Sequence, residues 1–168
     1  MLFTNHVLSG ALIGYGVRNP VLAFAVGVAS HLGLDAVPHW GQRQLSDVMH
    51  VAVTDGLLGA GTMAVVGATM SRHRRTAVLA GMAGAALLDM DKPCTVFFGG
   101  SPFPAVVDRV HAGIQRESPH RMPQELAVGV AGALVVSALV RRSRTAPGGR
   151  ARGHDGRGNA VRRGLVAR

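Results

Sequence analysis

Long apolar runs, with the charged residues gathered between them, dominate the first 140 residues of this chain. Hydrophobic residues make up 48% of the sequence and charged residues only 16%. A soluble amphipathic helix repeats polar residues every third or fourth position, so that one of its faces meets water. The apolar runs in this chain leave no such face. The pattern therefore predicts an all-α fold, a polytopic transmembrane bundle of about five apolar helices.

Five segments carry the pattern, and most of them are separated by polar or helix-breaking clusters. They are residues 2–17, 20–37, 46–70, 76–88 and 126–140. Asn19 is expected to cap the second segment, with Pro20 at its first helical position. The last two segments are shorter than the ~20 residues that a membrane span needs. A soluble bundle of buried apolar helices therefore stays open as the alternative.

The positive charge is concentrated at the carboxyl end of the chain. Nine of the 18 basic residues follow Val140, where Asp155 is the only acid. This division predicts a membrane-embedded helical domain, residues 1–140, and a disordered basic tail, residues 141–168. The positive-inside rule places the cluster Arg72–Arg75 and the tail in the cytoplasm of a multi-pass protein. The simplest interpretation of the tail is a solvated stop signal. Attraction to anionic membrane lipid or to nucleic acid is the alternative, and neither needs a specific site.

Ionisable residues inside the apolar segments are costly and are usually functional. With the topology above, they gather near the outer leaflet, and the candidates are His6, His31, Asp35, His39, Asp55, Asp89 and Asp91. His31 and Asp35 are four residues apart and share one helix face, an arrangement that suits a divalent ion. A hydrogen-bonded pair that ties two helices together is the alternative. His39 would continue their stripe, although Pro38 is expected to bend the helix.

The third and fourth segments supply three carboxylates. Asp55 is the deeper acid of its segment and is followed by Gly56, which lets another helix approach. Asp89 follows apolar residues and is the better inward candidate, whereas Lys92 is available to neutralise Asp91. These carboxylates are the expected partners of the histidines.

A sixth helix is expected within residues 103–117. It places Val106, Val110 and Ile114 on one stripe, which is typical of an interfacial helix on the membrane surface. His111 lies at the edge of that stripe and is positioned to cap the site from outside. For a lone histidine, simple packing is an equally good interpretation.

Several of these motifs resemble those of a known family. The motifs are Asn5-His6, Ser30-His31-x3-Asp35 and Asp89-Met90-Asp91-Lys92-Pro93. They are similar to motifs of small bacterial integral membrane proteins related to the predicted membrane-bound metal-dependent hydrolases, a group that includes a LexA-regulated inner-membrane protein. The resemblance covers residues 4–115. It implies a place in the bacterial cytoplasmic membrane and metal-site roles for His6, His31, Asp35, Asp89 and Asp91, with His39, Asp55 and His111 as further polar positions.

The pattern and the resemblance together predict a membrane-bound metal-dependent hydrolase that acts on a lipid or phosphoester near the outer leaflet. The expected metal residues are His6, His31, Asp35, His39, Asp89 and His111, with Asp55 or Asp91 as general base. Imidazoles and carboxylates suit Zn²⁺, and Mn²⁺ is a second choice. The single cysteine excludes a multi-cysteine zinc site. Two alternatives remain, a non-enzymatic metal-binding or proton-handling membrane protein and a structural membrane scaffold.

Overall fold

The computed structural model describes residues 1–41 and 45–145, and this part of the chain is almost entirely helical. Its α-helices are α1 (Phe3–Val17), α2 (Pro20–Asp35), α3 (Met49–Thr69), α4 (Arg72–Ala86), α5 (Asp91–Phe98), α6 (Ala105–Ile114) and α7 (Met122–Thr145). The short elements are strands β1 (His39–Trp40) and β2 (Glu117–Ser118) and the 3₁₀ turns η1 (Leu45–Val48), η2 (Leu88–Met90) and η3 (Pro119–Arg121). The two strands pair in parallel. The predicted all-α class is confirmed for these residues.

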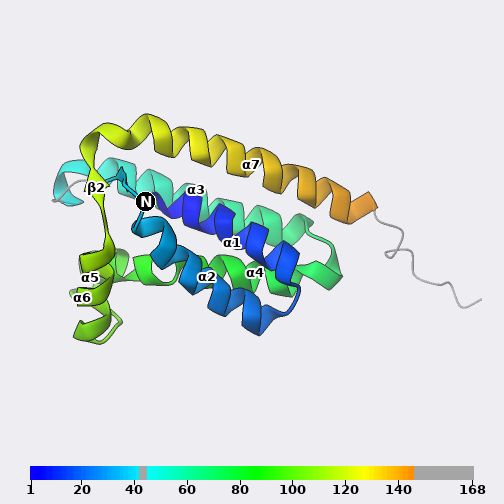
Figure 1. Cartoon of the computed structure of the whole chain (residues 1–168), viewed down its shortest axis with the longest axis horizontal. Coiled ribbons are helices and arrows are strands. Elements are labelled where there is room, and N and C mark those ends of the chain that lie inside the picture. Colours follow the sequence, from blue (N-terminus) through cyan, green and yellow to red (C-terminus); the bar gives the residue numbers. More distant parts are fainter. Residues whose placement is uncertain (42–44, 146–168) are drawn as a thin grey trace, which may run out of the picture.

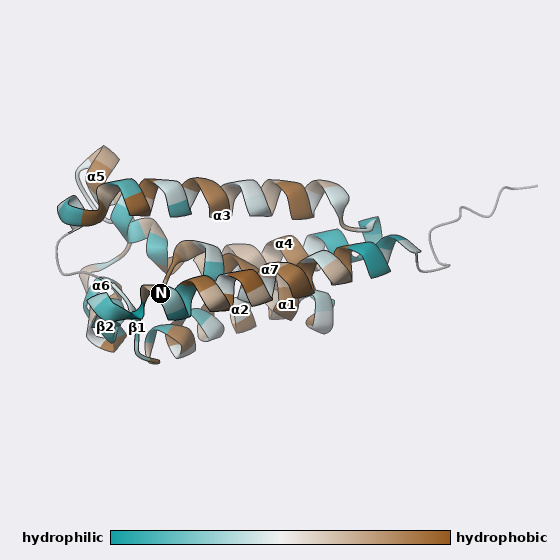
Figure 2. Ribbon diagram, turned by 90° about the horizontal axis from the view of Figure 1, so that it is seen from above, coloured by the Kyte–Doolittle hydropathy of each residue, from teal (hydrophilic) through white to brown (hydrophobic). Residues whose placement is uncertain are grey.

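The five longer helices run along the long axis of the molecule (Figure 1). The amino end of α1, the carboxyl ends of α2 and α4 and the amino end of α7 meet at one end, together with α5, α6 and the paired strands. The helix turns α1–α2 and α3–α4 and the carboxyl end of α7 lie at the other end. Hydrophilic residues gather at these two ends, and the stretch between them is largely apolar (Figure 2).

The boundary between α1 and α2 follows directly from local chemistry. Arg18 ends α1 in the left-handed backbone conformation, with a φ of 63°. The Asn19 side chain then accepts a hydrogen bond of 3.0 Å from the Leu22 backbone N–H, and Pro20 occupies the first helical position. The predicted cap of the second segment is confirmed.

Close backbone contact between helices forms the centre of the bundle, where α4 packs against both α1 and α2. A Cβ atom placed on Gly10 would collide with the Gly81 backbone carbonyl, and one placed on Gly81 would collide with that of Gly10. Only glycine permits this approach of α1 to α4, as is common between membrane helices. Buried Val7, Val78 and Met82 fill the neighbouring core.

Two helical stretches of the described residues, Ser46–Thr69 and Pro119–Thr145, are long and apolar enough to cross a membrane. Five spanning helices were expected. The helices α1, α2 and α4 have only 15 or 16 residues each, which is short of the ~20 that a span needs. Of the five expected segments, the third and the last lie in helices long enough to span, the last because α7 is longer than the segment expected there. The multi-pass arrangement stays a proposal.

The bounds of two segments differ from the sequence-based expectation. The fourth expected segment, residues 76–88, is α4, which begins earlier, at Arg72, and ends at Ala86. A separate helix, α5, starts at Asp91 and accommodates Pro93 in its first turn, where a missing N–H costs nothing. The last helix, α7, continues to Thr145, past the expected domain boundary at residue 140. Residues 146–168, the rest of the expected tail, lie outside the described residues.

Candidate metal centre

Five buried ionisable side chains meet at the end of the bundle where α5 and α6 lie. They are His6 on α1, His31 and Asp35 on α2, Asp89 in η2 and His111 on α6. Each is at most 6% exposed. Ionisable groups are almost never buried so fully unless they are paired or bind a metal. The cluster therefore requires a specific arrangement of partners.

The Asp35 carboxylate is the centre of the cluster. Its Oδ1 accepts a hydrogen bond of 3.2 Å from His6 Nε2. Its Oδ2 lies 3.1 Å from His111 Nε2 and 3.2 Å from His31 Nε2. One carboxylate thus contacts imidazoles from three helices.

The far nitrogen of His31 is held by the backbone. His31 Nδ1 donates a hydrogen bond of 2.6 Å to the Ala85 carbonyl, near the end of α4. Because a carbonyl only accepts, the neutral ring carries its proton on Nδ1 and presents a lone pair at Nε2. That lone pair faces Asp35 Oδ2 at 3.2 Å and His111 Nε2 at 3.0 Å. Three such atoms lie this close only with a proton, which His111 can carry, or a metal cation between them.

The far nitrogen of His111 is held by a carboxylate. His111 Nδ1 lies 3.3 Å from Asp91 Oδ2. Burial alone would disfavour the charged ring, but the hydrogen bonds to Asp35 and Asp91 raise the pKa of His111 to about 9. A histidine that is oriented by a carboxylate through one nitrogen, with the other aimed at the site, is the usual form of a metal ligand.

Asp89 and His6 each keep an atom without a partner. Asp89 Oδ1 accepts a hydrogen bond of 2.9 Å from Lys92 Nζ. Within residues 1–41 and 45–145, the buried atoms Asp89 Oδ2 and His6 Nδ1 have no hydrogen-bond partner. Asp89 Oδ2 lies 3.8 Å from His6 Nε2, and the His6 ring stacks on that of His31 with centroids 3.9 Å apart. A carboxylate oxygen left unpaired beside imidazoles fits a cation ligand.

Two overlapping groups have the spacing of a metal site, His6–His31–Asp89 and His31–Asp35–His111, with ligand atoms within 4.8 Å of one another. His31 belongs to both groups, and its one free lone pair serves one ion. In the second group the three ligand atoms are 3.0, 3.1 and 3.2 Å apart. Tetrahedral Zn²⁺ with bonds of ~2.0 Å separates its ligands by roughly 3.3 Å. These residues therefore fit one tetrahedral cation with three protein ligands.

The structure brings six of the eight expected site residues to this cluster, if Asp91 is counted through its contact with His111. Asp55 is elsewhere, because its two carboxylate oxygens accept hydrogen bonds from the backbone N–H groups of Phe3 and Thr4 at the start of α1. His39 is buried beside β2, where its Nδ1 donates a hydrogen bond of 2.8 Å to the Val37 carbonyl. It belongs to neither metal group.

Three further groups at this end did not stand out in the sequence. Gln115 Nε2 donates a hydrogen bond of 3.3 Å to Asp35 Oδ2, and the Met1 amino group lies 3.1 Å from Asp35 Oδ1. Glu125 is buried and accepts hydrogen bonds from Leu2 N–H and from the Asn5 side chain, and so ties α7 to α1. The sequence did offer one sign of Glu125, because it is an acidic residue directly before the apolar segment that begins at Leu126.

No protein-family model matches this chain, and no curated protein or solved structure is detectably similar to it. The inference of a metal site at this cluster therefore depends on the positions of its own side chains.

Proposed function

We propose that the protein is a multi-pass membrane protein that binds one divalent cation, Zn²⁺, at this cluster and hydrolyses an ester or phosphoester bond of a membrane lipid. The observation that carries the metal proposal is the buried group His31–Asp35–His111, whose ligand atoms have the spacing of a tetrahedral site. The far nitrogens of both imidazoles are fixed by neighbours. Three protein ligands leave one position open for substrate or water, which is the pattern of catalytic zinc.

Exposed apolar surface supports the membrane part of the proposal. Only 11% of the most apolar window is buried in each of the two long helical stretches. Leu57 on α3 is 70% exposed and Leu134 on α7 is 64% exposed. The core helices of a soluble bundle would be buried, whereas lipid accepts this exposure. Because α1, α2 and α4 pack in the same bundle, they share the membrane, and the bilayer adapts to their shorter length.

The distribution of arginines supports one orientation. Arg72, Arg74 and Arg141 lie at the ends of α4 and α7 that are remote from the metal centre. The positive-inside rule puts this end, and the carboxyl end of the chain, in the cytoplasm. The metal centre is then near the outer leaflet, within reach of lipid headgroups.

The residues of the cluster have distinct tasks. A bound Zn²⁺ would lower the pKa of water at the open position and polarise the bond to be cleaved. Ala85 and Asp91 hold the rings of His31 and His111 in place. Asp91 Oδ1, like Asp89 Oδ2, is buried and has no partner within the described ranges. Because Asp91 contacts the ligand His111, it is the carboxylate to which we assign the role of accepting a proton. Asp55 is committed to α1 and does not take that role.

Metal content tests the binding proposal. The full chain, purified in detergent with Zn²⁺ present, is expected to carry one zinc per chain by elemental analysis. His31→Ala and Asp35→Asn should abolish stoichiometric zinc, while His73→Ala and His120→Ala, both at exposed positions, should not. Circular dichroism restricts the comparison to folded protein. Folded His31→Ala and Asp35→Asn proteins that keep full zinc would refute the site.

A second assay tests hydrolysis. Phospholipid vesicles containing the full chain are expected to release headgroup, to stop on chelation and to recover on addition of Zn²⁺. Protein that holds stoichiometric zinc and cleaves neither phospholipid nor a soluble phosphoester would refute the hydrolase and leave a metal-binding membrane protein.

A further inference from the structure

An apolar groove runs between the two longest helices. Both α3 and α7 pack on α1 and leave between them a cavity of about 430 Å³. Apolar Leu8, Leu58 and Val65 line it, together with small Gly61 and Ala133. In a membrane this open apolar groove faces the hydrocarbon, where an acyl chain can lie along it.

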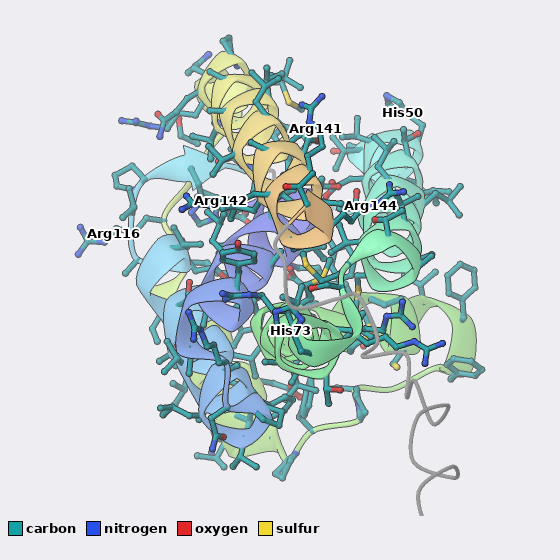
Figure 3. All side chains as sticks on the ribbon, turned by 90° about the vertical axis from the view of Figure 1, so that its right-hand side faces the viewer. His50, His73, Arg116, Arg141, Arg142 and Arg144 are labelled. Atoms are coloured by element: carbon teal, nitrogen blue, oxygen red, sulfur yellow. The ribbon has the colours of Figure 1, made fainter. Side chains whose placement is uncertain are left out.

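The groove continues toward the cytoplasmic end and becomes basic there. A second cavity of about 340 Å³ shares Val65, Val66 and Val136 with the first and is lined at its far end by Arg141 and Arg144. Figure 3 shows Arg141 and Arg144 on the side of α7 toward α3, and Arg142 on the opposite side. The groove is thus apolar along its length and carries two guanidinium groups at one end.

We propose that this α3–α7 groove binds one anionic phospholipid of the inner leaflet, with an acyl chain along Leu58 and Val65 and the phosphate at Arg141 and Arg144. Between Leu57 and Thr69 the groove wall extends ~18 Å at 1.5 Å per residue. One leaflet of hydrocarbon is ~15 Å thick, so the groove has the length of an acyl chain. Guanidinium groups match phosphate oxygens in geometry and charge.

Charge favours a lipid over a second copy of this chain. A second copy in the same membrane has the same orientation, so its own Arg141 and Arg144 would come to the same level as those of the first. Like charges at close range are unfavourable. An anionic headgroup neutralises the two arginines instead.

This lipid site lies at the opposite end from the metal centre, so it differs from the proposed substrate site. It rests on the membrane placement in the proposed function and not on the bound metal. Metal content and lipid binding measured on the same protein therefore separate the two proposals. Protein that stays in the membrane fraction with zinc but binds no anionic lipid contradicts the groove alone.

The test uses the full chain in detergent, titrated with phosphatidylglycerol or phosphatidylcholine, with bound lipid counted by native mass spectrometry. Phosphatidylglycerol is expected to bind one per chain, and more tightly than phosphatidylcholine. The double variant Arg141→Gln/Arg144→Gln should lose about 30-fold in affinity. Each arginine near anionic lipid contributes roughly fivefold to the affinity, and the two contributions multiply. The matched control, Arg142→Gln, lies on the same turn and should bind as the unmodified chain does.

A second pair of variants tests the apolar part of the groove. A Cβ at Gly61 or at Gly56 meets nothing within 4 Å, so both glycines of α3 tolerate a larger side chain. Gly61 lines the groove and Gly56 does not. Gly61→Leu is expected to exclude the lipid, and Gly56→Leu to retain it. Equal losses in Arg142→Gln and the double variant, retained lipid in Gly61→Leu, or a dimer in place of the lipid complex would each overturn the proposal.

Discussion

Replacing Asp55 by Asn separates a structural carboxylate from a catalytic one. Asp55 Oδ2 accepts a hydrogen bond of 2.6 Å from Phe3 N–H, and Oδ1 accepts one of 3.1 Å from Thr4 N–H. Its negative charge also lies at the amino end of α1, where the helix dipole favours it. Asn keeps the shape and one acceptor oxygen, but it turns an NH₂ group toward the other backbone N–H.

The size of the effect follows from those contacts. Hydrogen bonds to a charged group contribute ~1.5–3 kcal/mol each, and Asp55→Asn removes one and weakens the other. The free energy of unfolding should therefore fall by about 2–3 kcal/mol, while the zinc content of the folded protein stays at one per chain.

Thermal unfolding in detergent, followed by circular dichroism, measures the stability, and elemental analysis measures the zinc. Asp47→Asn is the matched control, because the exposed Asp47 carboxylate accepts a hydrogen bond only from the neighbouring Ser46 hydroxyl in the described structure, at 3.3 Å. It should leave the Tm unchanged. An unchanged Tm in Asp55→Asn, combined with lost hydrolysis and full zinc, would refute the structural assignment and restore Asp55 as general base.

Three further outcomes are expected. Gly81→Ala should lower the free energy of unfolding by ~1–3 kcal/mol, because its Cβ would press on the Gly10 carbonyl. Gly16→Ala places its Cβ in open space and should leave the stability unchanged. Thermal unfolding of the two variants tests this difference. Asp91→Asn should weaken zinc binding ~10- to 100-fold in a chelator competition, since Asp91 orients the His111 ring; unchanged affinity would remove Asp91 from the site. Zinc affinity should rise with pH up to about 9, because the pKa of His111 is raised to about 9 and zinc must displace the proton that the ring carries below that pH. A flat pH profile would show that His111 is not a ligand.

The local features of the fold were predictable from the sequence. Asn19 and Pro20 set the start of α2 through contacts within a few residues. His31 and Asp35 share a helix face because they are four residues apart, and the structure does bring their side chains within 3.2 Å. These interactions depend on chain geometry alone, which the sequence encodes directly.

The wider assembly of the site was only partly predictable. Position along the segments predicted that Asp55 and Asp89 lie at the same end of the bundle, and their contacts with the amino-terminal part of α1 confirm this. Position along a helix does not say which way its side chains are turned. Packing of α3 against α1 directs Asp55 to the first backbone N–H groups of α1 instead of the cluster. Its contact with Phe3 depends on tertiary packing, and so does the contact of Asp91 with His111.

The order of the ligands along the chain has a consequence for how the protein is made. His6 is synthesised almost at once and His31 soon after, whereas His111 follows only after α3, α4 and α5. Chains fold from the amino end as they emerge, so the nascent bundle holds an incomplete ligand set until α6 folds back on α2. Under the proposed function, cation capture is then a late event of biogenesis. On the same proposal, a chain interrupted before α6 would enter the membrane without acquiring the metal.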